Sequence, residues 1–132
     1  MNSIKFRDEL YENFGIKNLR ELVNCSAQNY GNDTAFLVKD KLGGAYRAIS
    51  YRRFRNDINN LGTSLLSLGL EGEKIALIGE NRYEWVVSYL AVTNGVGVIV
   101  PIDKELPEAE ITNLLRRSGA KAIIYSSKQG KK

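Results

Sequence analysis

Residues 72–125 read GEKIALIGENRYEWVVSYLAVTNGVGVIVPIDKELPEAEITNLLRRSGAKAIIY and contain three short apolar runs. None of the runs alternates apolar with polar residues, so each is expected to be a strand buried on both faces, as in a parallel sheet covered by helices. Helical segments separate the runs, which gives the order β-α-β-α-β with right-handed crossovers. The stretch predicts three parallel strands, at residues 74–79, 97–101 and 121–125.

The first crossover helix is predicted to begin at Asn81. Asparagine is a good helix cap, and Glu84 three residues later can bond back to the cap amide. The helix is apolar on almost every side, so the helix and its Trp85 are expected to be largely buried. Gly95 can take the left-handed backbone conformation that ends a helix.

The second crossover helix is predicted to begin with Pro107, whose missing amide hydrogen costs nothing in a first turn. Acidic residues in its first turn and basic residues in its last turn suit the helix dipole. Its apolar stripe is narrow, so we expect it to be half exposed, and Gly119 is expected to end it.

The segments before residue 72 predict a helix, a β-hairpin and a long helix. Asn18 can cap a helix that runs to about Tyr30. Strands are expected at residues 34–39 and 45–49, joined by a loop with two glycines. Ser50 can then cap a long helix, which has apolar residues on one face and ends at Gly69.

The predicted fold class is therefore α/β: a parallel β-α-β-α-β core preceded by a helix, a β-hairpin and a long helix. The 132 residues suffice for one domain over residues 1–132. Residues 1–17 are expected to be a partly ordered lead-in with a short helix around residues 6–11. Residues 126–132 are expected to be a frayed tail.

Composition favours a cytoplasmic protein. No apolar run approaches the roughly 20 residues of a membrane span, and the first ten residues lack the apolar core of a secretory signal. Cys25 is the single cysteine, so it cannot form an internal disulfide, which fits a reducing compartment.

The net charge of +4 gives no reason to expect nucleic-acid binding. Three lysines after residue 127 carry most of it, and no basic stripe with interleaved aromatic residues is present. Four arginines do cluster near the start of the long helix. We interpret them as a solvated helix start, and an acidic contact partner remains the alternative. They are Arg47, Arg52, Arg53 and Arg55.

The chain has few residues that could carry out chemistry. It contains no histidine and one cysteine, which leaves no histidine base and no cysteine–histidine metal site. It also contains neither GxxxxGK[ST] nor GxGxxG. We therefore predict no catalytic residue and no metal site, and we interpret Cys25 as a packing residue.

Ligands of open α/β sheets gather at the carboxyl ends of the strands. Here these ends are residues 79–81, 101–104 and 126–127, so Glu80 and Asp103 are the best-placed carboxylates. Structural alternatives remain open for both: a charge at a helix start for Glu80, and a turn residue bonding backbone amides for Asp103.

Several motifs in this order resemble the N-terminal region of the acyl-adenylate-forming, or AMP-binding, enzymes. They are ISYRRF at residues 49–54, GENRYEW at 79–85 and LAVTNGVGVIVPIDKELPEAEI at 90–111, followed by a strand that ends at Tyr125. The resemblance covers residues 18–127, and the NR–EW pattern is most similar to long-chain fatty acyl-CoA synthetases. Lys104 stands where many members have proline.

The resemblance implies a fragment of a larger doubly wound AMP-binding domain. Such enzymes activate a carboxylate with ATP and magnesium, then transfer the acyl group to coenzyme A. The resemblance implies a fatty acid as substrate and the remainder of the enzyme as partner. The family's phosphate loop, magnesium glutamate and catalytic lysine have no counterpart here, so the fragment alone is expected to be inactive. Asp103 and Lys104 are the candidate cofactor-binding residues, near the coenzyme A path.

Two further expectations follow. A fragment of a larger α/β domain leaves sheet edges and helix surfaces uncovered, so the isolated chain is expected to self-associate. The alternative to the fragment interpretation is a free-standing small α/β binding or interaction domain without catalysis.

Overall fold

The computed structural model describes residues 14–130, so the short helix predicted around residues 6–11 lies outside the described residues. The order of elements is the predicted one. The bounds are α1 Leu19–Asn29, β1 Thr34–Val38, β2 Arg47–Ser50, α2 Tyr51–Ser67, β3 Lys74–Ile78, α3 Tyr83–Thr93, β4 Val98–Pro101, α4 Glu108–Ser118 and β5 Ala122–Tyr125.

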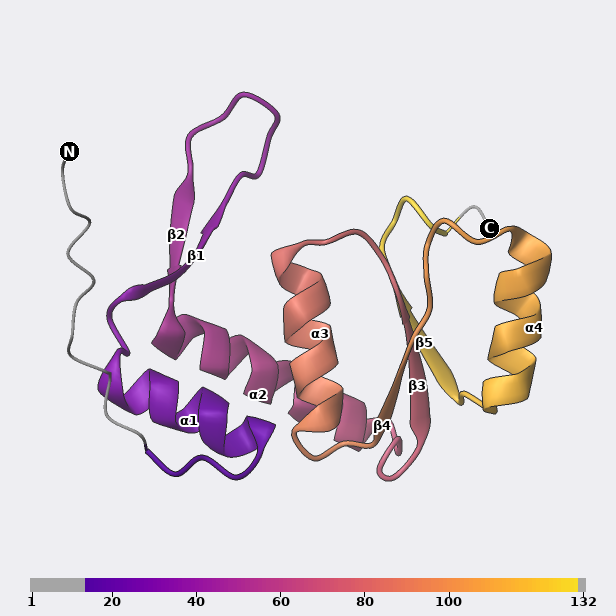
Figure 1. The fold of residues 1–132 in the computed structure, drawn as a ribbon, viewed down its shortest axis with the longest axis horizontal. Helices are drawn as coiled ribbons and strands as arrows, with labels where there is room; N and C mark the ends of the chain where they lie inside the picture. Colours follow the sequence, from indigo (N-terminus) through magenta and orange to yellow (C-terminus); the bar gives the residue numbers. More distant parts are fainter. Residues whose placement is uncertain (1–13, 131–132) are drawn as a thin grey trace, which may run out of the picture.

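The parallel three-stranded core is confirmed. β3 lies in the middle of the sheet, in the order β4-β3-β5, and pairs in parallel with both neighbours. β1 and β2 form a separate antiparallel hairpin that projects from the body of the molecule (Figure 1). α3 and the end of α2 cover one face of the sheet, and α4 covers the other (Figure 1).

Burial on both faces holds for β3 alone. Ile75 and Ala76 are fully buried, because β3 has a strand on each side and helices above and below. In β4 and β5 the prediction was wrong, since both are edge strands that the helices cover only in part. Val98, Ile123 and Tyr125 keep about half of their surface exposed. The apolar runs identified strands but not their place in the sheet.

The core is divided between the two faces of the sheet. On one face, Val92 of α3 and Leu65 of α2 pack on Ile75. On the other face, Ile111 of α4 packs on Ala76 and Ile78. A further cluster joins α3 to α1 and α2 through Val23, Ile58, Val87 and Ala91. α3 is therefore packed between helices and the sheet, whereas α4 has solvent on its outer side.

Helix ends confirm some predicted caps and correct others. Asn18 Oδ1 accepts a hydrogen bond from the Glu21 amide at 2.8 Å, and Ser50 Oγ accepts one from the Arg53 amide at 3.2 Å. Gly119 ends α4 in the left-handed conformation. Pro107 is the residue before the first helical turn of α4 rather than its first residue.

The cap predicted for α3 was wrong. Arg82 takes the cap position in extended backbone geometry, no side chain caps the helix, and Asn81 lies outside it. The start of the helix is fixed by Tyr83, whose ring packs against Phe36 and Phe54 with centroid distances of 5.2 and 5.9 Å. This aromatic contact places residue 83 in the first turn, because packing outweighs the cap preference of asparagine.

Among residues 14–130, no helix has both the length and the apolar character needed to cross a membrane.

Candidate functional site

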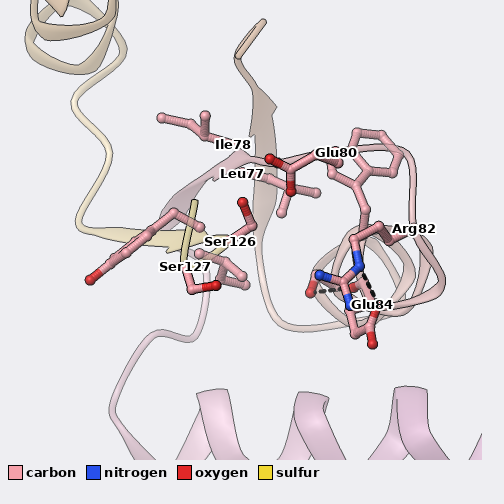
Figure 2. Close-up of a pocket in the computed structure, with 12 residues that line it drawn as sticks. Leu77, Ile78, Glu80, Arg82, Glu84, Ser126 and Ser127 are labelled. Carbon is pink, nitrogen blue, oxygen red and sulfur yellow. Dashed lines mark hydrogen bonds and ion pairs between the residues drawn. The ribbon is translucent and has the colours of Figure 1, made fainter. Parts of the chain in front are cut away.

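The carboxyl ends of β3 and β5 form a pocket with the start of α3. Its volume is about 230 Å³, and its lining includes Glu80, Trp85, Ser88 and Ser126. Figure 2 shows the side-chain oxygens of Glu80 and Ser126 turned toward each other across the strand ends. The pocket lies where ligands of open α/β sheets are expected.

Glu80 is held by the turn that follows β5. Gln129 Nε2 donates a hydrogen bond to Glu80 Oε1 at 3.2 Å. The Ser126 hydroxyl, the Gln129 amide and the backbone amide of Glu80 lower the pKa of the Glu80 carboxyl to about 2, because donors beside a carboxylate favour its charged form. Glu80 is therefore a carboxylate at any physiological pH.

Residues 126–130 of the tail predicted to be frayed form a turn in the structure. The Gln129 amide donates to the Ser126 carbonyl at 2.9 Å, which closes a turn directly after β5. Glu80 Oε2, Ser126 Oγ and Gln129 Oε1 are buried under this turn without a hydrogen bond of ordinary geometry in this conformation. The Ser126 hydroxyl thus lies near the Glu80 carboxylate but forms no hydrogen bond with it in this conformation.

The opposite wall of the pocket is aromatic and charged. Trp85 stacks on Tyr89 with ring centroids 5.5 Å apart. Arg82 Nε and Glu84 Oε2 form an ion pair at 3.3 Å, which is also drawn in Figure 2. Trp85 is half-buried. Its predicted deep burial was therefore wrong, because the pocket leaves part of the ring uncovered.

Asp103 and Lys104 follow β4 and do not line this pocket. Asp103 Oδ1 accepts a hydrogen bond from the Glu105 amide at 2.9 Å, the turn role left open by the sequence. Lys104 pairs with Glu105, and this contact raises the pKa of the lysine, with smaller contributions from the charges of Glu80 and Asp103.

Gln129 is the site residue that sequence reasoning missed. It lies in a polar segment without hydrophobic periodicity, so only the turn at residue 126 brings it to Glu80. The arginine cluster has acidic partners within the chain: Arg47 pairs with Asp40 at 3.1 Å, and Arg53 pairs with Asp57 at 2.8 Å.

The donor set limits the chemistry at this edge. Within the described residues, no three His, Cys, Asp or Glu side chains lie together as a metal site. The pocket presents the Glu80 carboxylate, and the charge of its one lining arginine, Arg82, is offset by the ion pair with Glu84, so its net charge is unfavourable for phosphate groups. It can anchor the turn after β5 or accept hydrogen bonds, but it has no cation-rich cradle for a triphosphate.

A larger cleft of about 570 Å³ separates the hairpin from the start of α3. Phe36, Asn81 and Tyr83 contribute to its lining, together with ionised side chains of both signs. Asn81, predicted as a helix cap, therefore faces this cleft.

Comparison with known proteins agrees with the fold. Residues 24–132 match the family described as AMP-binding enzyme. The mitochondrial medium-chain acyl-CoA ligase ACSF2 of Rattus norvegicus is 24% identical over 110 residues, which cover 83% of this chain and 17% of that protein. Surfactin synthase subunit 1 of Bacillus subtilis is 35% identical over 113 residues, 85% of this chain and 3% of that protein.

A solved structure shows the same arrangement. The crystal structure of the anthranilate CoA ligase AuaEII in complex with anthranoyl-AMP superposes with a TM-score of 0.75 and 25% identity over 85% of this chain. The matched part is 21% of that chain. The sequence here thus spans about a fifth or less of the length of these relatives.

Proposed function

The chain belongs to the AMP-binding enzyme family, and we propose that it is the N-terminal part of an ATP-dependent acyl-CoA synthetase. The match over residues 24–132 carries this proposal, and the agreement in fold with a CoA ligase supports it. The proposed reaction is activation of a carboxylic acid as its adenylate, followed by acyl transfer to coenzyme A.

A fatty acid is the proposed substrate class. The similarity of GENRYEW at residues 79–85 to long-chain synthetases supports it, and so does the rat relative named as a medium-chain acyl-CoA ligase.

The proposed location is the cytoplasm, from the composition and the single cysteine. A fluorescent fusion that collects in another compartment would overturn the location without affecting the reaction.

The residues described here do not fit the nucleotide of that reaction. Adenylation requires cations and amide donors aimed at the reacting phosphate. Glu80 and Asp103 carry the wrong charge for it, and Lys104 is already paired with Glu105. We therefore assign binding of ATP and magnesium to the remainder of the enzyme, and we derive no chemical step at the pocket.

Asp103 and Lys104 are proposed to lie along the coenzyme A path. Lys104 is half-buried at a strand end and paired with Glu105, and in this proposal a phosphate group of coenzyme A replaces the Glu105 carboxylate as the partner of its ammonium group. In the longer enzyme, Lys104→Ala should raise the KM for coenzyme A about fivefold or more while leaving pyrophosphate exchange intact. Lys121→Ala, an exposed lysine before β5, is the matched control.

The test of the main proposal is carboxylate-dependent exchange of pyrophosphate into ATP. The 132-residue chain alone should show no exchange, and the protein encoded by the longer reading frame should show exchange with fatty acids. Exchange by the isolated chain that is lost in Lys104→Ala would overturn the assignment of the nucleotide site. A reading frame that ends at Lys132 would instead favour a free-standing binding domain.

Self-association of the isolated chain stays a prediction. β4 and β5 are unpaired on their outer edges within the described sheet, and Ile123 and Tyr125 are exposed on β5. Edge strands recruit other strands, so light scattering should show a concentration-dependent rise in mass. A monomer at all concentrations would contradict this expectation.

A further inference from the structure

The β1–β2 hairpin carries a surface that the proposed function does not use. Figure 1 shows it projecting away from the layers formed by the helices and the parallel sheet. Leu42, in the loop that joins the two strands, is fully exposed, and Tyr46, which enters β2, is 64% exposed. Single exposed leucines are common, but here an aliphatic and an aromatic side chain share one projecting loop.

The charges around these two residues have mostly one sign. Lys39, Lys41 and Arg47 flank them, and the ammonium group of Lys39 lies 4.4 Å from the centroid of the Tyr46 ring. Asp40 is the acidic residue of the segment 39–47, and it is paired with Arg47. The loop therefore presents net positive charge around an apolar tip.

We propose that the hairpin loop, residues 39–47, docks on an anionic lipid bilayer. Leu42 would enter the apolar side of the interface, and Tyr46 would lie at headgroup level, where tyrosine is enriched. Lys39 and Lys41 would contact anionic headgroups, as basic residues do at negatively charged membranes. The net positive charge of the loop is complementary to an anionic lipid surface, which favours that surface over an uncharged partner. The proposal does not depend on the acyl-CoA synthetase assignment.

The backbone supports this role for the loop. Gly43 has a φ of +78°, and a Cβ placed there would meet no atom within 4 Å, so the loop tip is unpacked. Leu42 therefore gains no burial within the chain, and insertion into a bilayer would bury it without breaking a contact. The ion pair between Arg47 and Asp40 holds the base of the loop, at the first residue of β2.

Vesicle sedimentation of the 132-residue chain tests the proposal. The chain should sediment with vesicles of phosphatidylcholine and phosphatidylglycerol, but not with phosphatidylcholine alone, and salt should release it. Lys41→Glu should weaken binding about tenfold or more, since each basic residue near the surface contributes roughly fivefold. Leu42→Ser should weaken binding about tenfold or more, since it removes the side chain that enters the apolar side of the interface.

Matched controls come from other surfaces. Leu68→Ser changes a leucine that is 73% exposed at the end of α2, and Lys121→Glu changes an exposed lysine before β5. Both should leave binding within about twofold of the unaltered chain. Equal losses in these controls, or no sedimentation with the anionic vesicles, would overturn the proposal.

A second measurement locates the contact directly. In a Cys25→Ser background, Leu42→Cys and Leu68→Cys are each labelled with an environment-sensitive dye. Anionic vesicles should shift the emission of the dye at position 42 to the blue and leave the dye at position 68 unchanged. Vesicle binding without a shift at position 42, or a shift without vesicles that indicates a second copy, would assign the loop to another role.

Discussion

The two crossover helices have the same length and the same role of connecting two parallel strands, yet their surroundings differ. α3 and α4 each have 11 residues and each connects two parallel strands. Four residues of α3 are buried, against Ile111 alone in α4. α3 has helices α1 and α2 on its outer side, whereas α4 faces solvent there. The comparison shows that a helix with a wide apolar face is covered on more sides than a helix with a narrow one.

The largest expected effect on stability is the difference between alanine substitutions at the glycines that follow the two helices, Gly97 after α3 and Gly119 after α4. A Cβ at Gly97 would lie 2.1 Å from the Glu73 carbonyl oxygen, whereas a Cβ at Gly119 would meet no atom within 4 Å. Gly97→Ala should therefore lower the free energy of unfolding by about 3 kcal/mol or more, because backbone must move. Gly119→Ala should cost about 1–2 kcal/mol for its left-handed conformation.

Urea unfolding of the two glycine variants measures this difference. If both cost the same, the junction between α3 and β4 would be looser than the structure shows, and the contrast between the helix ends would not hold.

The next effect compares one core side chain from each helix. Val92 of α3 is fully buried, and Leu114 of α4 is half-buried. Val92→Ala should cost about 2–3 kcal/mol, since two methyl groups leave a packed site. Leu114→Ala should cost about 1 kcal/mol, although it removes more atoms, because part of the side chain is in water. Thermal unfolding measures both losses of stability. A larger loss for Leu114→Ala than for Val92→Ala would contradict the prediction.

Much of this contrast could be predicted from the sequence, because apolar periodicity depends on burial itself. The narrow stripe of α4 matched its environment, and the all-round apolar surface of α3 did so except at Trp85, which borders the strand-end pocket. The exposure of Val98 and Ile123 could not be predicted, since an apolar run does not show whether a strand is central or at an edge. That information depends on the strand order, which arises from the whole fold.

The strand ends that form the pocket were predictable, but its contacts were not, and the candidate residues Asp103 and Lys104 lie outside it. The strand order β-α-β-α-β places Glu80 and Ser126 at one edge of any parallel sheet. The contact with Gln129 depends on a turn with no distinct pattern, and the missing Asn81 cap depends on the packing of Tyr83 in an aromatic cluster. Local preferences describe isolated segments, and these two features are tertiary.

A smaller effect tests the polar link that α3 has to α2. The Tyr83 hydroxyl donates to Asp57 Oδ2 at 2.9 Å, and burial, followed by this hydrogen bond, raises the pKa of the tyrosine. Tyr83→Phe should cost about 1 kcal/mol at neutral pH.

The raised pKa of Tyr83 also predicts a pH dependence. A tyrosine whose pKa is higher in the folded state stabilises the fold fully below pH ~10, the unfolded pKa, and this contribution is lost as the pH rises above it. The unaltered chain should therefore lose stability more steeply than Tyr83→Phe above pH ~10. Parallel pH profiles of the two proteins would contradict the link.

The smallest effect is spectroscopic and concerns the uncovered part of α3. Trp85 is the single tryptophan, and it is half-buried beside the strand-end pocket. Iodide should quench it to an intermediate degree, more than a core tryptophan and less than a free one. The Glu80 carboxylate across the pocket should repel iodide, so neutral acrylamide should quench more strongly than iodide.

A matched probe on α4 is Thr112→Trp in a Trp85→Phe background, because Thr112 is exposed. Its quenching should approach that of free tryptophan with both agents. Equal quenching at positions 85 and 112 would mean that α3 is no better covered than α4 at this end, and that the pocket wall formed by Trp85 opens in solution.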